Sequence, residues 1–119
     1  MVILAVEDEP FILQNLEWII EDMGHTALVA TDLTGALAHL ATGQTIDGLF
    51  VDIRLAALAF GGYDVADQAI GLRPHLRVLY TSGSSLTPDM TRRFVPGGCF
   101  LQKPYSHAQI KASIVEILQ

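Results

Sequence analysis

The sequence predicts an α/β protein in which a five-stranded parallel sheet lies between two layers of helices. Three observations lead to this prediction. Short apolar, β-branched runs alternate with amphipathic segments five times along the chain. The run at 48–51 is apolar on both faces, which is typical of a central strand in a parallel sheet. The 119 residues, half of them hydrophobic, suffice for one domain, 1–119, with one continuous core.

The first helix is predicted by the residues at its two ends. It follows an apolar strand at Val2–Val6 and begins at Pro10, because proline favours the first turn of a helix. It runs to about Met23, and Gly24 suits its C-terminal stop. The residues that we expect to face the sheet recur at helical spacing: Phe11, Ile12, Leu16, Ile19 and Ile20.

The next elements follow the same alternation. Thr26–Ala30 predicts a short strand, and Thr34–Ala41 predicts a helix that Gly43 ends. Gly48–Val51 predicts the central strand, and the long loop Arg54–Gly62 follows it. We expect the apolar side chains of that loop to fold back as cover: Leu55, Leu58 and Phe60.

The second half of the chain supplies two more units and part of a third. Tyr63–Leu72 predicts a helix and Val78–Thr81 a strand. The segment 86–98 carries two prolines and predicts a fourth helix that is short or irregular, entered at 87–89 and ended at 96–98. Cys99–Leu101 predicts the last strand, and Ser106–Leu118 predicts the closing amphipathic helix.

Carboxylates follow two of the predicted strands. Glu7, Asp8 and Glu9 come directly after the first strand, and Asp52 comes after the third. The carboxyl ends of parallel neighbours lie at one edge of a sheet, so these side chains are expected to meet there. Clustered carboxylates repel one another unless a cation offsets them, which predicts a divalent-cation site at Glu7, Asp8 and Asp52. Glu9 is assigned instead to the N-terminus of the following helix.

Composition excludes several other classes. The net charge is −6 and the seven basic residues are scattered, so we expect no direct contact with nucleic acid. No apolar run approaches the ~20 residues that cross a bilayer, and a cytoplasmic location without membrane contact is expected. The single cysteine, Cys99, cannot form an internal disulfide.

Four motifs together resemble the receiver domain of two-component response regulators, the family typified by the bacterial chemotaxis regulator. They are Val6-Glu-Asp-Glu-Pro10, Val51-Asp52, Thr81-Ser82-Gly83 and Lys103-Pro104, each at the end of a predicted strand. The resemblance covers essentially the whole chain and implies a flavodoxin-like (βα)5 fold.

The resemblance implies that Asp52 accepts a phosphoryl group. Magnesium would be held by Glu7, Asp8, Asp52 and the backbone carbonyl of Arg54, with Asp8 as a direct ligand and Glu7 acting through water. The chain departs from the family pattern in the metal loop, where Ala56 stands at a position that is commonly proline.

Three further residues take roles from the same resemblance. Ser82 would hydrogen-bond to the phosphoryl group, with Thr81 as the alternative hydroxyl one residue earlier. Lys103 would pair with Asp52 and later with the phosphoryl group. Phe100, three positions before the lysine, would be the aromatic switch residue together with Ser82, although a plain core role for Phe100 is nearly as well supported.

The implied partners are proteins. A histidine kinase or histidine phosphotransfer protein would donate the phosphoryl group, and a downstream protein target would read the result, with the chain as a monomer or homodimer. The chain would be a signalling phosphoacceptor rather than an enzyme, although it would assist its own phosphorylation and autodephosphorylation. The alternative is a non-phosphorylated pseudo-receiver that acts as a constitutive interaction module. A dehalogenase-type phosphatase is excluded because it needs an aspartate where Arg54 stands.

Overall fold

The computed structural model describes residues 1–55 and 57–119, and along them five strands alternate with five helices. The strands are β1 (Val2–Val6), β2 (Thr26–Ala30), β3 (Gly48–Asp52), β4 (Arg77–Ser82) and β5 (Cys99–Gln102). The helices are α1 (Pro10–Asp22), α2 (Leu33–Leu40), α3 (Gly61–Leu72), α4 (Pro88–Arg93) and α5 (His107–Ile117). The predicted alternation is confirmed, and Ala56 lies outside the described residues.

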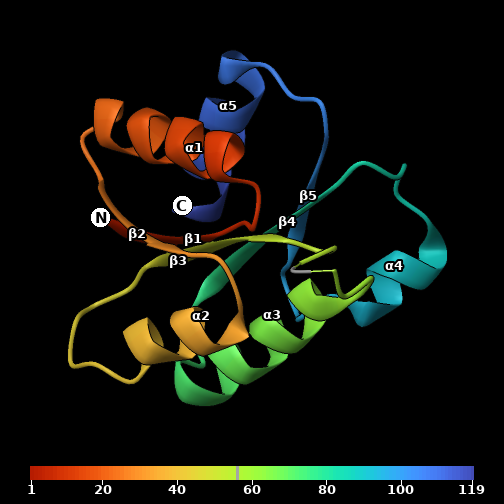
Figure 1. Ribbon diagram of the computed structural model, residues 1–119, viewed down its shortest axis with the longest axis horizontal. Coiled ribbons are helices and arrows are strands. Elements are labelled where there is room, and N and C mark those ends of the chain that lie inside the picture. The colour runs from red at the N-terminus through yellow and green to blue at the C-terminus, as the bar shows by residue number, and fades with distance from the viewer. Residues whose placement is uncertain (56) are drawn as a thin grey trace.

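The strands form one parallel sheet in the order β2-β1-β3-β4-β5. Helices α1 and α5 cover one face of this sheet, and α2 and α3 cover the other (Figure 1). Helix α4 lies apart from both layers, near the carboxyl end of β4. The three-layer architecture expected from the sequence is therefore confirmed.

The register brings four strand ends to one edge. Val6 pairs with Val51, and Asp52 pairs with Thr81. Ser82 pairs with Gln102 at the end of the last strand. The residues that follow β1, β3, β4 and β5 therefore meet at the same place.

Alternation along the strands divides the core into two parts. Leu4 and Val51 contribute to the cluster under α2 and α3, whereas Ile3 and Phe50 contribute to the cluster under α1 and α5. All five residues of β3 are buried because both faces of this strand are covered. The expected central strand is thus the one that carries Asp52.

Capping side chains explain where several helices begin. The Glu9 carboxylate accepts the backbone N–H of Ile12 at 2.8 Å, which confirms its assignment to the start of α1. Asp32 caps α2 through the N–H of Gly35, so this helix begins one residue earlier than predicted. Ser106 forms a capping box with Gln109 at the start of α5, in which the side chain of each residue accepts the backbone N–H of the other.

Three expectations about exposure and boundaries are wrong. The side chain of Phe11 is 80% exposed, because α1 turns Leu13 rather than Phe11 toward the sheet. In the long loop Leu55 is buried as expected, but Leu58 and Phe60 are each 61% exposed. Helix α3 begins at Gly61, two residues before the predicted start; although glycine is a poor helix former, Gly62 lets this first turn pack against the backbone at the end of β3, where a Cβ would lie 2.2 Å from the carbonyl oxygen of Asp52.

Helices in the described part of the chain are too short or too polar to cross a bilayer.

Candidate functional site

Three carboxylates converge at the shared strand edge. Glu7 follows β1 and is buried, Asp52 ends β3 and is buried, and Asp8 is exposed. One carboxylate oxygen from each lies within 4.8 Å of the others. Two buried carboxylates and one exposed carboxylate make a site that opens to solvent on the Asp8 side.

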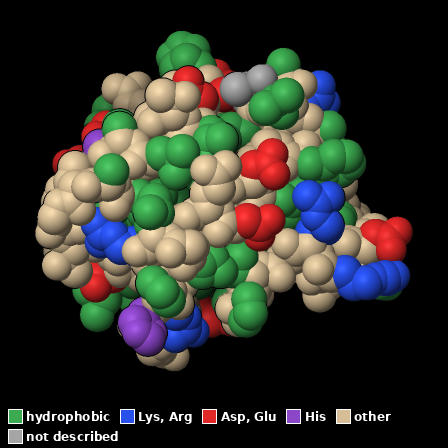
Figure 2. Space-filling model, turned by 90° about the horizontal axis from the view of Figure 1, so that it is seen from below, with side chains coloured by type: hydrophobic (Ala, Val, Ile, Leu, Met, Phe, Trp, Pro, Cys, Tyr) green, Lys and Arg blue, Asp and Glu red, His purple; other side chains and the backbone are tan. Residues whose placement is uncertain are grey.

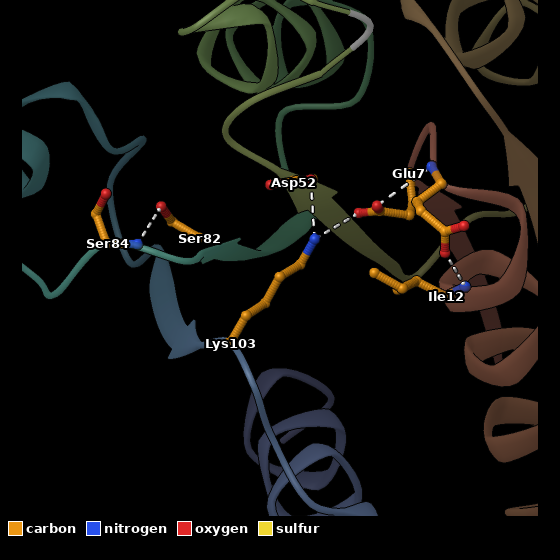
Figure 3. A network of polar contacts seen from close by, with 7 residues as sticks. Glu7, Ile12, Asp52, Ser82, Ser84 and Lys103 are labelled. Atoms are coloured by element: carbon orange, nitrogen blue, oxygen red, sulfur yellow. Dashed lines mark hydrogen bonds and ion pairs between the residues drawn. The ribbon is translucent and has the colours of Figure 1, made fainter.

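Lys103 supplies the positive charge of this cluster. Its Nζ donates to Asp52 Oδ2 at 3.0 Å and to Glu7 Oε2 at 3.1 Å (Figure 3). The lysine reaches the cluster from the end of β5, and its backbone N–H donates to the carbonyl of Ser82 at 2.8 Å. The peptide bond between Lys103 and Pro104 is cis. The predicted convergence of Asp52, Glu7 and Lys103 is observed.

Burial and mutual charge alter the acidity of the cluster. Burial, and then the neighbouring Asp52 carboxylate, raises the pKa of Glu7 to about 7 against the opposing effect of Lys103. Burial by itself would lower the pKa of Lys103, but the hydrogen bond to Asp52 and the charges of both carboxylates raise it above its ordinary value. The lysine therefore stays protonated while Glu7 titrates near neutrality.

The backbone that presents Asp52 is held from two sides. The N–H of Ile53 donates to the carbonyl of Thr81 at 2.9 Å, and the N–H of Gly62 donates to the carbonyl of Ile53 at 2.8 Å. A Cβ at Gly62 would lie 2.2 Å from the carbonyl oxygen of Asp52. The sequence interpretation missed this role for Gly62; the only signal was the paired glycines at 61–62.

The two candidate hydroxyls occupy different environments. Thr81 is fully buried beside Asp52 in the sheet, and its Oγ1 has no hydrogen-bond partner among the described residues. Ser82 lies one residue nearer to solvent, and its Oγ accepts the N–H of Ser84 at 3.1 Å. Figure 3 shows Ser82 directed toward Ser84 and away from Asp52.

The donor set suits a hard divalent cation. Carboxylate oxygens are the ligands that magnesium prefers, and Asp8 gives the cluster an open side for the waters that magnesium retains. Arg54 lies two residues after the end of β3, in the loop that leads to α3, and its side chain is exposed.

Phe100 lies on β5 and is partly buried. Its ring stacks on that of Phe94, with centroids 6.2 Å apart, and packs against the core under α2 and α3.

On the other side of the site, Phe11, Ile12 and Asn15 of α1 face Lys103 and Tyr105 across a cavity of about 600 Å³. The exposed Phe11 thus stands at the mouth of a cavity next to the acidic cluster.

Comparison with known proteins identifies the family. The chain matches the response regulator receiver domain family over residues 3–115. It is 31% identical over 105 residues to the nitrogen assimilation regulatory protein NtrX of Azorhizobium caulinodans, which covers 87% of this chain and 23% of that longer protein. The chain therefore spans about a quarter of the length of this relative.

Solved structures agree with the family match. A response regulator receiver protein from Sinorhizobium medicae has a TM-score of 0.87 at 28% identity, over 99% of this chain and 94% of that one. Chemotaxis protein CheY4 of Vibrio cholerae has a TM-score of 0.86 at 20% identity, over 98% of each chain, which shows a common fold. With the acidic cluster, Lys103 and the parallel sheet all in place, the chain belongs to the response regulator receiver domain family.

Proposed function

We propose that Asp52 accepts a phosphoryl group from a phosphohistidine of a histidine kinase or histidine phosphotransfer protein, and that this changes the contacts of the chain with a downstream protein. The observation that carries the proposal is Lys103, whose ammonium group bridges buried Asp52 and Glu7 at 3.0 and 3.1 Å. Receiver domains as a family act as signalling phosphoacceptors. Aspartate carboxylates act as nucleophiles in phosphoryl transfer and form aspartyl-phosphate intermediates.

The transfer needs few residues. An Asp52 oxygen attacks phosphorus, the P–N bond to the donor imidazole breaks, and the imidazole nitrogen keeps the electron pair and takes a proton. Lys103 offsets the negative charge that gathers on the phosphoryl oxygens, and Ser82 turns to donate its hydroxyl to one of them. Water later attacks the same phosphorus, which releases inorganic phosphate and restores the Asp52 carboxylate.

The carboxylate cluster would hold the cation that this reaction requires. Asp8 and Asp52 would bind Mg²⁺ directly together with the carbonyl of Arg54, and Glu7 would bind it through water. When bound, Mg²⁺ neutralises charge on the phosphoryl group and so reduces its repulsion of the attacking carboxylate. The structure supports this assignment through the 4.8 Å grouping of the three carboxylates.

The cavity beside Lys103 offers a place for the donor protein. A phosphohistidine must reach Asp52, and this cavity of about 600 Å³ lies next to the cluster with mostly apolar walls. Phe11 is 80% exposed at its mouth, where it would contact the donor. The donor would therefore approach over the N-terminal end of α1.

The test is intact-mass analysis after incubation with acetyl phosphate and Mg²⁺. We expect wild type to gain one phosphoryl group, Asp52→Asn to gain none, and Asp64→Asn, an exposed carboxylate change on α3, to behave like wild type. EDTA should prevent the gain. No gain in wild type would reject the phosphoacceptor role and favour a pseudo-receiver that binds partners constitutively.

A further inference from the structure

Helix α4 contributes one partly buried side chain, Met90, to the packing against the core. It has six residues, and none of them is buried. Its outer surface is charged: Arg92 pairs with Asp89 at 2.8 Å, and the two side chains are 65% and 92% exposed. In Figure 2, where α4 projects at the right, side chains of both charges lie on its surface. A helix this short depends on contacts at its ends to keep its position.

Aromatic rings provide one of these contacts. Phe94, directly after α4, stacks on Tyr80 with centroids 4.2 Å apart and an interplanar angle of 12°. Tyr80 is fully buried, and its hydroxyl accepts the N–H of Val95 at 2.9 Å. A Cβ at Gly98 would lie 2.9 Å from the Tyr80 ring, so glycine is needed for this packing. Phe94 also stacks on Phe100, the residue assigned to the aromatic switch.

Arg93 provides a second contact, which joins α4 to the start of helix α3. Its guanidinium carbon lies 4.5 Å from the centroid of the Tyr63 ring and 5.8 Å from that of Phe60. Tyr63 belongs to the first turn of α3, and Phe60 immediately precedes that helix. The two rings themselves stack at 6.1 Å. This cation–π contact therefore joins the last residue of α4 to the loop that follows Asp52.

The turn between β4 and α4 joins Ser82, beside the acceptor site, to helix α4 and its aromatic contacts. Ser82 Oγ accepts the N–H of Ser84 at 3.1 Å and points away from Asp52 (Figure 3). A cavity of about 360 Å³ is lined by Ser82, Ser84, Tyr63 and Met90. The turn thus has room to move, whereas the far end of α4 is fixed by rings and by Arg93.

We propose that Arg93 is a positioning residue that latches α4 to Tyr63 and Phe60 in the resting state, and so opposes the turn of Ser82 toward phosphorylated Asp52. The inference rests on the proposed acceptor role of Asp52. A contact made only in the resting state lowers the population of the switched state. Acetyl phosphate reacts faster with the switched state, in which Ser82 faces Asp52, so this contact also slows phosphorylation. Loss of the latch should therefore make phosphorylation easier.

The experiment compares Arg93→Gln with Arg92→Gln, which removes the same charge from the same helix, together with the exposed ion pair to Asp89, but leaves the contacts of Arg93 with both rings in place. Phosphorylation by acetyl phosphate with Mg²⁺ is followed by intact mass, and hydrogen exchange of the unphosphorylated proteins is followed over 83–94. We expect Arg93→Gln to be phosphorylated about threefold faster than wild type, as the loss of one exposed cation–π contact implies. Its exchange over 83–94 should also be faster, and Arg92→Gln should match wild type in both measurements.

If Arg93 only stabilises α4, Arg93→Gln would show faster hydrogen exchange over 83–94 without faster phosphorylation. That result would overturn the proposed effect of Arg93 on the acceptor site. Equal behaviour of the two variants would overturn the latch itself. If wild type takes no phosphoryl group, the proposed function fails separately, and the exchange comparison alone decides whether Arg93 holds α4. Faster exchange in Arg93→Gln than in Arg92→Gln then supports the latch, and equal exchange rejects it.

Discussion

Lys103 and Lys111 show how the surroundings of one residue type decide its importance. Lys103 faces two buried carboxylates, whereas Lys111 pairs with Asp22 at the surface, where the side chains are 44% and 72% exposed. In EDTA we expect Lys103→Met to lower the free energy of unfolding by about 3 kcal/mol, because two buried carboxylates lose their cation. Lys111→Met should cost less than about 1 kcal/mol. Urea unfolding measures both, and equal costs would contradict the assigned role of Lys103.

Glu7 makes the stability of the metal-free protein depend on pH. Burial and then Asp52 raise its pKa from 4.5 to about 7, so the folded chain holds this proton more tightly than the unfolded chain does. The resulting contribution to stability is fully present below about pH 4.5 and is lost as the pH rises through 7. Between pH 5 and 8, unfolding by urea in EDTA should therefore show a loss in wild type that is absent from Glu7→Gln. A parallel pH dependence in the two proteins would show that Glu7 is not the group responsible.

At the scale of elements, the contact between α3 and β3 sets the position of Asp52. A Cβ at Gly62 would lie 2.2 Å from the Asp52 carbonyl oxygen and 2.6 Å from Ile53 Cα, both of them backbone atoms that cannot move aside separately. Gly62→Ala should therefore destabilise the fold by about 3 kcal/mol or more. Gly71→Ala, in the same helix but with open space around it, should be neutral or stabilising by up to about 1 kcal/mol. Thermal unfolding of the pair checks this, and similar melting temperatures would argue against the close contact.

Elements with a strong local signal were predictable from the sequence. The strands Val2–Val6 and Thr26–Ala30 were predicted with their observed bounds, because an apolar run between polar turns defines both ends. The start of α1 followed from Pro10. The start of α3 did not, since Gly61 and Gly62 are poor helix formers, and only the packed fold shows that Gly61 lies against the preceding loop and Gly62 against the end of β3. Phe11 was misplaced because helical spacing alone does not fix which edge of the apolar stripe meets the sheet.

At the scale of the whole molecule, the parallel order of the strands made the acidic cluster predictable. Once β1, β3 and β5 run parallel, their carboxyl ends must share an edge, and Glu7, Asp52 and Lys103 meet there. The rings around α4 were not predictable in this way. Tyr63, Tyr80 and Phe94 come from three separate segments, and only the packed fold shows that they touch. The orientation of Ser82 likewise depends on a turn whose sequence permits several hydrogen-bond patterns.

Magnesium binding should stabilise the entire domain, because the carboxylates that hold the ion come from the ends of two strands and are brought together only by folding. At a Mg²⁺ concentration of 100 times Kd, the free energy of unfolding should rise by about 2.7 kcal/mol. Asp8→Asn tests the site without disturbing the core: the side chain is exposed, and without metal the loss of its charge relieves repulsion from Glu7 and Asp52, so metal-free stability should stay the same or rise. The Mg²⁺-dependent gain should nevertheless largely disappear, since a proposed direct ligand has lost its charge. Thermal unfolding in EDTA and in Mg²⁺ measures both quantities, and an undiminished gain in Asp8→Asn would place the cation elsewhere than among Glu7, Asp8 and Asp52.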